Sequence, residues 1–242
     1  MVPSMPVTTA LLSAEETSQL AQSFEARPAE EVLGWVAERF AGEAVLTCSW
    51  QMTSSVLVHM VQRIGADIRI VELDTGLLFP ETYAVRDALV QRYDLRVERI
   101  LPLQTVAEQE AEHGPTLWER DPDRCCDLRK VEPFERALAG AAAWITGVRR
   151  SQSATRAGIR KIELDADRAL VKVQPLADWS EEDVRTYLAV NDVPYNALHD
   201  RGYPSIGCIP CTRAVAPGED SRAGRWAGTE KTECGLHIRS DR

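Results

Sequence analysis

The chain has 242 residues, of which 44% are hydrophobic and 27% are charged, and its formal net charge is −9. A chain of this length can bury the core of one domain, and it contains no run of eighteen apolar residues that would span a membrane. The lack of a secretory signal in residues 1–12 predicts a cytoplasmic, reducing environment, and the acidic charge argues against a general nucleic-acid binder.

Patterns typical of helices and strands alternate along most of the chain. A capping box at Ser13 and Glu16 predicts a first helix over 13–25, and apolar spacing predicts a second over 28–40. Short apolar runs predict buried strands at 44–48, 67–73, 97–101, 142–146 and 170–173. Further helices are predicted at 54–64, 80–93 and 180–190. This alternation predicts a doubly wound, mostly parallel α/β sheet.

The pattern changes past Tyr195, where Gly, Pro and charged residues predominate. We therefore expect one α/β domain over residues 1–215, with helices in residues 1–40, followed by a loop-rich tail over residues 216–242. The tail contains four glycines, which are permissive for backbone motion, and we predict that it is mobile.

Four of the six cysteines fall into two close pairs, Cys125-Cys126 and Cys208-x-x-Cys211. Adjacent cysteines do not readily form a disulfide with each other, because that bond needs a particular Cα separation. Four thiolates from two such pairs suit a metal centre, either an iron–sulfur cluster or zinc. Adjacent cysteines on one tetrahedral zinc ion would be strained. Cys234 stands apart near the C-terminus.

Two predicted strand ends carry residues suited to an anionic ligand. The first is followed by Ser49, Gln51, Ser54 and Ser55, whose hydroxyl and backbone N–H groups lie at a predicted helix N-terminus. The second reads Leu73-Asp74-Thr75-Gly76. Ligands bind at strand ends in open parallel sheets, but plain helix capping and a simple turn are the alternatives.

Basic residues gather in two segments despite the acidic overall charge. The first segment contains Arg149, Arg150, Arg156, Arg160 and Lys161, and the second contains Arg213, Arg222 and Arg225. Such clusters are often solvated surface, but two of them beside cysteine motifs favour a local anion pocket.

The stretch from Thr47 to Leu57 resembles the pyrophosphate loop of the adenine-nucleotide α-hydrolase-like superfamily, whose usual form is Ser-Gly-Gly-x-Asp-Ser. Trp50 and Gln51 replace the two glycines, and Thr53 replaces the aspartate. Because the glycines permit close approach to a triphosphate, this departure speaks against ATP pyrophosphatase chemistry. The resemblance implies a Rossmann-like fold.

Further motifs follow in order along the chain. They are Cys125-Cys126-Asp127-Leu128-Arg129-Lys130, Ile145-Thr146-Gly147-Val148-Arg149, Gly207-Cys208-Ile209-Pro210-Cys211 and Glu233-Cys234-Gly235-Leu236-His237. In this combination the chain resembles the assimilatory adenylyl-sulfate reductases of the iron–sulfur-cluster type, within the phosphoadenylyl-sulfate reductase family. The resemblance covers about residues 40–240.

The resemblance implies a thioredoxin-dependent reductase of sulfate assimilation that converts adenosine 5′-phosphosulfate to sulfite and AMP. Cys234 would attack the substrate's sulfur to form an S-sulfocysteine, from which a thioredoxin or glutaredoxin-type dithiol protein releases sulfite. The cysteines that would hold a 4Fe–4S cluster are Cys125, Cys126, Cys208 and Cys211. The cations expected to offset the substrate's charge are Lys130, in a catalytic role, and Arg149, Arg156, Arg222 and Arg225.

Two alternatives accompany this interpretation. A reductase of the 3′-phosphorylated substrate would resemble the chain but would lack the cysteine pairs. A zinc-containing, non-redox protein of nucleotide binding and sulfur transfer is the rival of another class, and iron and acid-labile sulfide content separates the two. No nucleic-acid or membrane partner is expected, whereas the oligomeric state, a homo-oligomer included, stays open.

Overall fold

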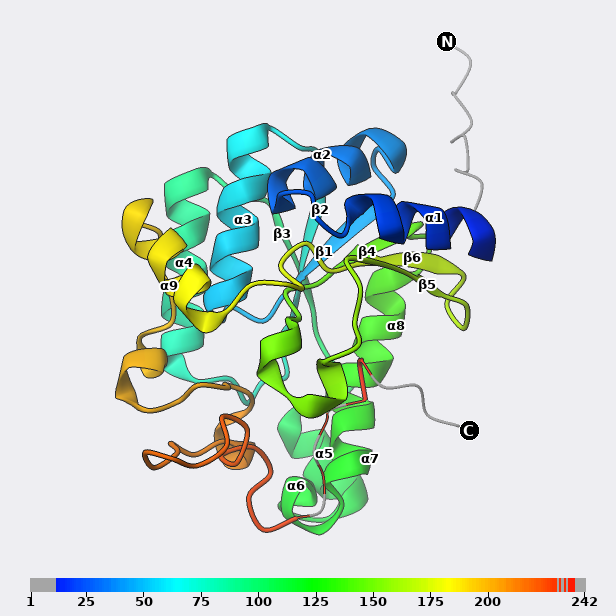
Figure 1. Ribbon diagram of the computed structural model, residues 1–242. Coiled ribbons are helices and arrows are strands. Elements are labelled where there is room, and N and C mark those ends of the chain that lie inside the picture. Colours follow the sequence, from blue (N-terminus) through cyan, green and yellow to red (C-terminus); the bar gives the residue numbers. More distant parts are fainter. Residues whose placement is uncertain (1–11, 230, 232, 234, 238–242) are drawn as a thin grey trace.

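Six strands form a single sheet in the computed structural model of the protein, which describes residues 12–229, 231, 233 and 235–237 (Figure 1). The strands are β1 (Ala44–Cys48), β2 (Arg69–Leu73), β3 (Val97–Ile100), β4 (Ala143–Ile145), β5 (Ile162–Asp165) and β6 (Leu170–Val173). Their order is β3-β2-β1-β4-β6-β5, with β5 antiparallel to β6 and the other neighbours parallel. The predicted doubly wound, mostly parallel sheet is confirmed.

Helices cover both faces of this sheet. The longer ones are α1 (Ala14–Phe24), α2 (Ala29–Arg39), α3 (Met52–Ile64), α4 (Pro80–Tyr93), α8 (Glu132–Leu138) and α9 (Glu181–Val190). Successive side chains of a strand point to opposite faces, so Leu46 joins the core formed with α1–α4 and α9, while Val45 packs with Phe134 of α8. Within the described ranges, every helix is too short or too polar to cross a membrane.

Local sequence signals start the helices as predicted. The Ser13 hydroxyl accepts a hydrogen bond from the Glu16 N–H at 3.2 Å, and the Glu16 carboxylate accepts one from the Ser13 N–H at 2.8 Å. Ser180 and Asp183 form the same reciprocal pair at the start of α9. Each box satisfies N–H groups that the first helical turn leaves without an intrahelical partner.

The region between β3 and β4 holds elements that the sequence pattern does not predict. They are α5 (Val106–His113), α6 (Leu117–Arg120), α7 (Pro122–Cys126) and a π-helical turn, η1 (Asp127–Val131), which leads into α8. These helices have four to eight residues, too few turns for an apolar period to be recognised. The short antiparallel strand β5 is likewise unpredicted, and α3 begins at Met52 rather than Ser54.

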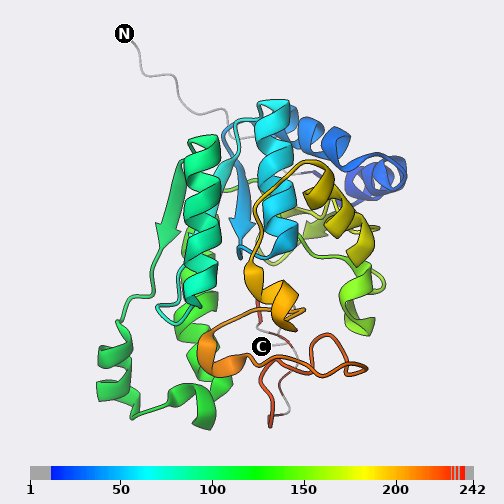
Figure 2. The ribbon, with the colours of Figure 1, turned by 90° about the vertical axis from the view of Figure 1, so that its left-hand side faces the viewer.

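The described chain after α9 consists of loops and 3₁₀ turns. The turns are η4 (Ala197–Arg201) and η5 (Ile209–Cys211), and two more, η2 (Arg150–Gln152) and η3 (Ala154–Arg156), precede β5. Isolated bridges join Leu78 to Cys208 and Thr212 to Arg225. Figure 2 shows this segment, drawn in orange to red, beyond the ends toward which the parallel strands point. It therefore covers the edge of the sheet where ligands bind in this architecture.

We expect Leu46→Ala to lower the free energy of unfolding by about 2–5 kcal/mol, because it removes a fully buried side chain from the centre of the core. Urea unfolding followed by circular dichroism measures the loss. Leu103→Ala is the matched control, since Leu103 is 77% exposed and its truncation should change stability by less than about 0.5 kcal/mol. Equal losses in the two variants would contradict the described core.

Candidate active site

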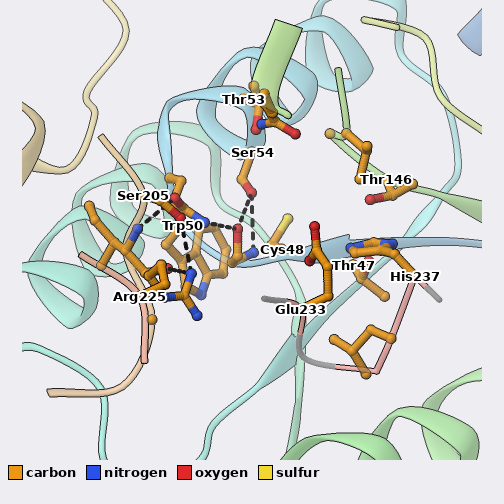
Figure 3. A pocket seen from close by; sticks show the side chains of 18 of the residues that line it. Thr47, Cys48, Trp50, Thr53, Ser54, Thr146, Ser205, Arg225, Glu233 and His237 are labelled. Atoms are coloured by element: carbon orange, nitrogen blue, oxygen red, sulfur yellow. Dashed lines mark hydrogen bonds between the residues drawn. The ribbon is translucent and has the colours of Figure 1, made fainter. Parts of the chain in front are cut away.

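A cavity of about 280 Å³ opens at the carboxyl ends of β1, β2 and β4 (Figure 3). β1 pairs with β2 on one side and with β4 on the other, so the cavity lies where the chain changes direction across the sheet. The C-terminal segment supplies the opposite wall, including Trp226 and Glu233. Sequence-predicted residues in the lining are Ser49, Gln51, Ser54, Leu73, Thr75, Lys130, Arg149, Arg156, Arg222 and Arg225.

The loop after β1 forms one wall and is held by its own side chains. The Ser54 hydroxyl accepts a hydrogen bond from the Ser49 N–H at 3.1 Å, and Gln51 accepts one from the Ile206 N–H at 2.9 Å. Gln51 thereby ties this loop to the chain that leads into the second cysteine pair. Ser55 lies fully buried behind the loop and is not part of the cavity lining.

Close packing brings the loop after β4 against the start of α3. A Cβ at Gly147 would lie 2.6 Å from the Thr53 hydroxyl oxygen, so the glycine is required for this approach. Thr53 and Gly147 both line the cavity. A third residue, His199, supports the same loop from behind, because its Nε2 accepts a hydrogen bond from the Met52 N–H at 3.4 Å.

The turn after β2 divides its four predicted residues between two roles. Leu73 and Thr75 line the cavity, whereas Asp74 is buried in the turn and accepts hydrogen bonds from the Gly76 N–H and the Tyr83 hydroxyl, both at 2.8 Å. Burial opposes ionisation of Asp74, but these donors and the Arg99 guanidinium outweigh it, so its pKa lies below the usual value. Asp74 and Gly76 therefore shape the turn from outside the cavity.

The two cysteine pairs meet in a second, smaller cavity beside the first. Cys125 and Cys126 come from α7, and Cys208 and Cys211 come from the segment around η5. Cys211 is partly exposed and the other three are buried. Burial raises the pKa of Cys125 to about 11, and the neighbouring thiols of Cys126 and Cys208 add to that rise. The predicted grouping of these four cysteines is thus present in the fold.

The donor set of this smaller cavity suits a cluster better than a single ion. In the described residues, no three His, Cys, Asp or Glu side chains are grouped so as to hold one metal ion. A zinc ion needs its ligands to converge on one point, whereas a 4Fe–4S cluster takes one thiolate at each of four irons. Four thiols around a common cavity therefore fit the cluster.

Lys130 lies between the two cavities and lines both. It belongs to the π-helical turn η1, a local irregularity that is frequent at functional sites. Burial raises the pKa of Cys211 to about 12, and the positive charge of Lys130 acts against that rise, which places the ammonium close to the thiol. The preceding residue, Arg129, points elsewhere and donates to the Thr75 carbonyl at 2.6 Å.

The large cavity is basic although the protein is acidic. Its wall contains Lys130, Arg149, Arg156, Arg222 and Arg225 but only the carboxylates Glu181 and Glu233. Arg225 donates to the Ser205 hydroxyl at 3.0 Å, and a Cβ at Gly207 would collide with its guanidinium. Clustered charge of one sign in a concave site raises the local concentration of ligands of opposite charge.

Several buried N–H groups of the lining have no hydrogen-bond acceptor within the described part of the chain. They are the indole N–H groups of Trp50 and Trp226 and the Nε groups of Arg149 and Arg225. Buried donors are normally paired, so such a set calls for an acceptor from outside the chain. Together with the basic charge, the set favours an anionic ligand rich in oxygen atoms.

Arg156 and Arg222 bind a common partner, Glu233. Arg156 donates to the two carboxylate oxygens of Glu233 at 3.1 and 2.9 Å, and Arg222 donates to one of them at 2.8 Å. Glu233 immediately precedes Cys234, the predicted nucleophile, which lies outside the described residues. The described neighbours Glu233, Leu236 and His237 all line the cavity.

Aromatic and ionic contacts hold the chain around these neighbours. His237 stacks on Trp144 with ring centroids 5.3 Å apart, and burial keeps its pKa well below the usual value. The ammonium of Lys231 pairs with Asp123 and lies over the Trp226 ring. Both His237 and Lys231 therefore have packing partners of their own.

Sequence reasoning missed the lining roles of Thr47, Trp144, Thr146, Glu233 and His237. Thr47 accepts a hydrogen bond from the Trp144 indole at 2.8 Å, across the β1–β4 pair. Their positions at the ends of two predicted strands could have indicated them. Nothing local in the sequence indicates that Glu233 and His237 fold back onto those strand ends.

The fold and the cavity at its switch point define a protein of the adenine-nucleotide α-hydrolase-like class. The model of the phosphoadenosine phosphosulfate reductase domain matches residues 43–214, and the chain belongs to this family. The resemblance read from the motifs is thereby confirmed. So is the expectation of an oxidoreductase that acts on a sulfur group.

Relatives and a solved structure agree with this assignment. A protein of Streptomyces coelicolor named adenosine 5′-phosphosulfate reductase is 49% identical, over 92% of this chain and 95% of its own length. A protein of the same name from Staphylococcus epidermidis is 46% identical, over 88% of each chain. The crystal structure of a phosphoadenylyl-sulfate reductase from Candida auris is similar with a TM-score of 0.76 and 30% identity, covering 86% of this chain and 100% of that one.

We expect His199→Gln to reduce the acid sensitivity of the fold. Burial lowers the pKa of His199 from 6.5 to about 4, so the unfolded chain protonates this ring at a higher pH than the folded protein does. The stabilising contribution is complete above about pH 6.5 and is lost as the pH falls to about 4. The variant should therefore gain up to about 3 kcal/mol relative to the native chain over this window.

Urea unfolding at pH 7.5, 5.5 and 4.5 measures this relative gain. Glutamine retains an oxygen that can accept from the Met52 N–H, so the variant removes the titration rather than the acceptor. A stability difference that stayed constant between pH 7.5 and pH 4.5 would contradict a neutral, buried His199.

Proposed function

We propose that this protein reduces adenosine 5′-phosphosulfate to sulfite and AMP, with Cys234 as nucleophile and a thioredoxin or glutaredoxin-type dithiol protein as reductant. The observation that carries the proposal is the joint position of Lys130 and the neighbours of Cys234. Lys130 lines both the four-cysteine cavity and the basic cavity, and Glu233, Leu236 and His237 line the basic one. Family membership supports the same reaction class.

The basic cavity supports an adenylyl sulfate as the ligand. Its size is within the range of small-molecule sites, and its cations and unpaired N–H donors match a phosphosulfate group flanked by a ribose. The relatives at 42–49% identity are named for the unphosphorylated substrate, which favours adenosine 5′-phosphosulfate over its 3′-phosphorylated form. Ser49, Gln51 and Ser54 supply the polar wall at the start of α3.

The proposed reaction is two successive displacements at sulfur. The Cys234 thiolate attacks the sulfur of the sulfo group, a carbon-free S–S bond forms, and the S–O bond to the phosphate breaks so that AMP leaves. A thiolate of the dithiol protein then attacks the cysteine sulfur and releases sulfite, leaving a mixed disulfide. The second thiol of the partner closes its own disulfide and returns Cys234 to the thiol, so the partner supplies both electrons.

Cations of the cavity lower the cost of bringing a thiolate to an anionic substrate. Lys130, Arg149 and Arg225 line the cavity and can stabilise the charge that develops on the leaving phosphate. The four cysteines would hold a 4Fe–4S cluster, which when bound would supply a charged iron–sulfur centre beside Lys130. Asp74 and Gly76 contribute by shaping the turn that presents Thr75.

The proposal includes a mobile tail over residues 216–242 that follows the α/β domain of residues 1–215. A single closed position would suit attack on the substrate but would hinder a bulky dithiol protein that must reach Cys234 afterwards. Gly218 and Gly228, both with φ near +88°, are positions in the tail where the backbone adopts a conformation that favours glycine.

We expect the purified protein, supplied with a reduced dithiol protein, to form sulfite and AMP from adenosine 5′-phosphosulfate much faster than from its 3′-phosphorylated form. The Cys234→Ser variant should bind AMP with native affinity and form no sulfite, because it lacks the attacking thiolate. Sulfite assay and calorimetric titration with AMP give the two readouts. Preference for the 3′-phosphorylated form would move the assignment to that substrate.

Omission of the reductant isolates the first step of the same reaction. Mass spectrometry should then find one SO₃ group on Cys234 of the native chain. Cys48→Ala is the control, because Cys48 is a buried thiol that also lines the cavity and the variant should still acquire the adduct. An adduct on Cys48, or sulfite formation by Cys234→Ser, would overturn the proposed nucleophile.

We expect serine in place of any one of Cys125, Cys126, Cys208 and Cys211 to lower the iron and acid-labile sulfide content and to bleach the brown colour of the protein. The reason is that a hydroxyl is a poor substitute for a thiolate ligand of the cluster. Metal analysis and the visible spectrum measure the loss. Cys48→Ala should retain native iron content, and a native protein with stoichiometric zinc and no iron would favour the non-redox rival.

A further inference from the structure

Glu233 is a buried carboxylate that faces into a cavity suited to anions. Its side chain is only 4% exposed, although it lines the large cavity. The two arginines that hold it are also largely buried, with side-chain exposures of 12% for Arg156 and 15% for Arg222. A charged group is seldom buried to this degree without direct charge partners, so these three side chains form one ionic unit.

The geometry of this unit is the geometry with which arginines bind oxyanions. The Nε and Nη2 groups of Arg156 donate to separate oxygens of Glu233, in the parallel two-bond arrangement that a guanidinium makes with carboxylate, sulfate or phosphate. Arg222 adds a third bond from another direction. Figure 3 places Glu233 near His237 and Thr47, on the floor of the cavity rather than at its rim.

We propose that Glu233 is an internal competitor for the anion site, whose carboxylate occupies Arg156 and Arg222 until the anionic group of the ligand replaces it. This inference rests on the proposed function, because it takes the cavity's ligand to be an adenylyl sulfate. The ligand offers oxygens of the same spacing and charge, so exchange preserves the hydrogen bonds of both arginines. The exchange gives Glu233 a direct role in setting ligand affinity.

Competition has a consequence that a purely structural ion pair lacks. If Glu233 only braced the two arginines for the ligand, its loss would leave them misplaced and anions would bind more weakly. If it competes with the ligand, its loss removes a negative charge and a rival partner, and anions bind more tightly. The direction of the change in affinity therefore separates the two roles.

The test is the Glu233→Gln variant of the full chain, titrated calorimetrically with AMP, adenosine and inorganic sulfate at constant ionic strength. Glutamine keeps the shape of the side chain and one acceptor oxygen but removes the charge. We expect AMP and sulfate to bind about tenfold more tightly than to the native chain, while adenosine, which has no anionic group, binds equally to both.

Glu219→Gln is the matched control. Glu219 pairs with Arg213 in the same C-terminal segment, but both side chains are exposed and neither lines the cavity, so this variant should bind AMP and sulfate as the native chain does. Unchanged or weaker binding of sulfate by Glu233→Gln would overturn the competition. Thermal unfolding in sulfate gives a second measure, since a tighter ligand raises the melting temperature more.

The outcomes also separate this inference from the proposed function. Sulfate that bound more tightly to Glu233→Gln, with AMP bound by neither protein, would uphold competition at the arginine pair and defeat the nucleotide function. AMP bound equally by both proteins, with sulfate unaffected by the substitution, would leave the nucleotide function standing and defeat the competition.

Discussion

The common direction of the parallel strands is the constraint on which the candidate site depends. β1, β2 and β4 end at the same edge of the sheet, so the short segments that follow them meet although they are far apart in the sequence. Ser54, Thr75 and Arg149 reach one cavity for this reason. The segment after α9 then closes over that edge and adds its own side chains (Figure 2).

Charge is separated within this fold. A protein with a net charge of −9 concentrates basic side chains around one cavity, and carboxylates such as Asp74 are neutralised within the surrounding turns. The lone basic residue shared with the thiol cavity, Lys130, links the electrostatics of the two sites among the residues described. Substitutions near the cysteines can therefore alter anion binding without contacting the ligand.

Signals that are local in the sequence predicted the structure well, and those that depend on distant contacts did not. The capping boxes at Ser13 and Ser180 and the apolar strands were readable because their partners lie within a few residues. The cysteine pairs were readable from spacing alone. The pairing of Glu233 with Arg156 spans 77 residues and depends on how the tail folds back, which no period or motif encodes. Likewise, the turn at Asp74 resembled a ligand loop because capping and ligand binding use the same residue types.

The π-helical turn η1 makes the register of this region sensitive to chain length. A π turn holds one residue more than an α turn would, and here the extra residue lets Arg129 and Lys130 serve different surroundings. Deletion of one residue would restore a regular α-helix but would rotate everything after it by about 100°. Phe134, whose ring centroid lies 4.7 Å from that of Trp144, would then leave the sheet. Point substitutions in η1 are thus far less disruptive than a one-codon deletion there.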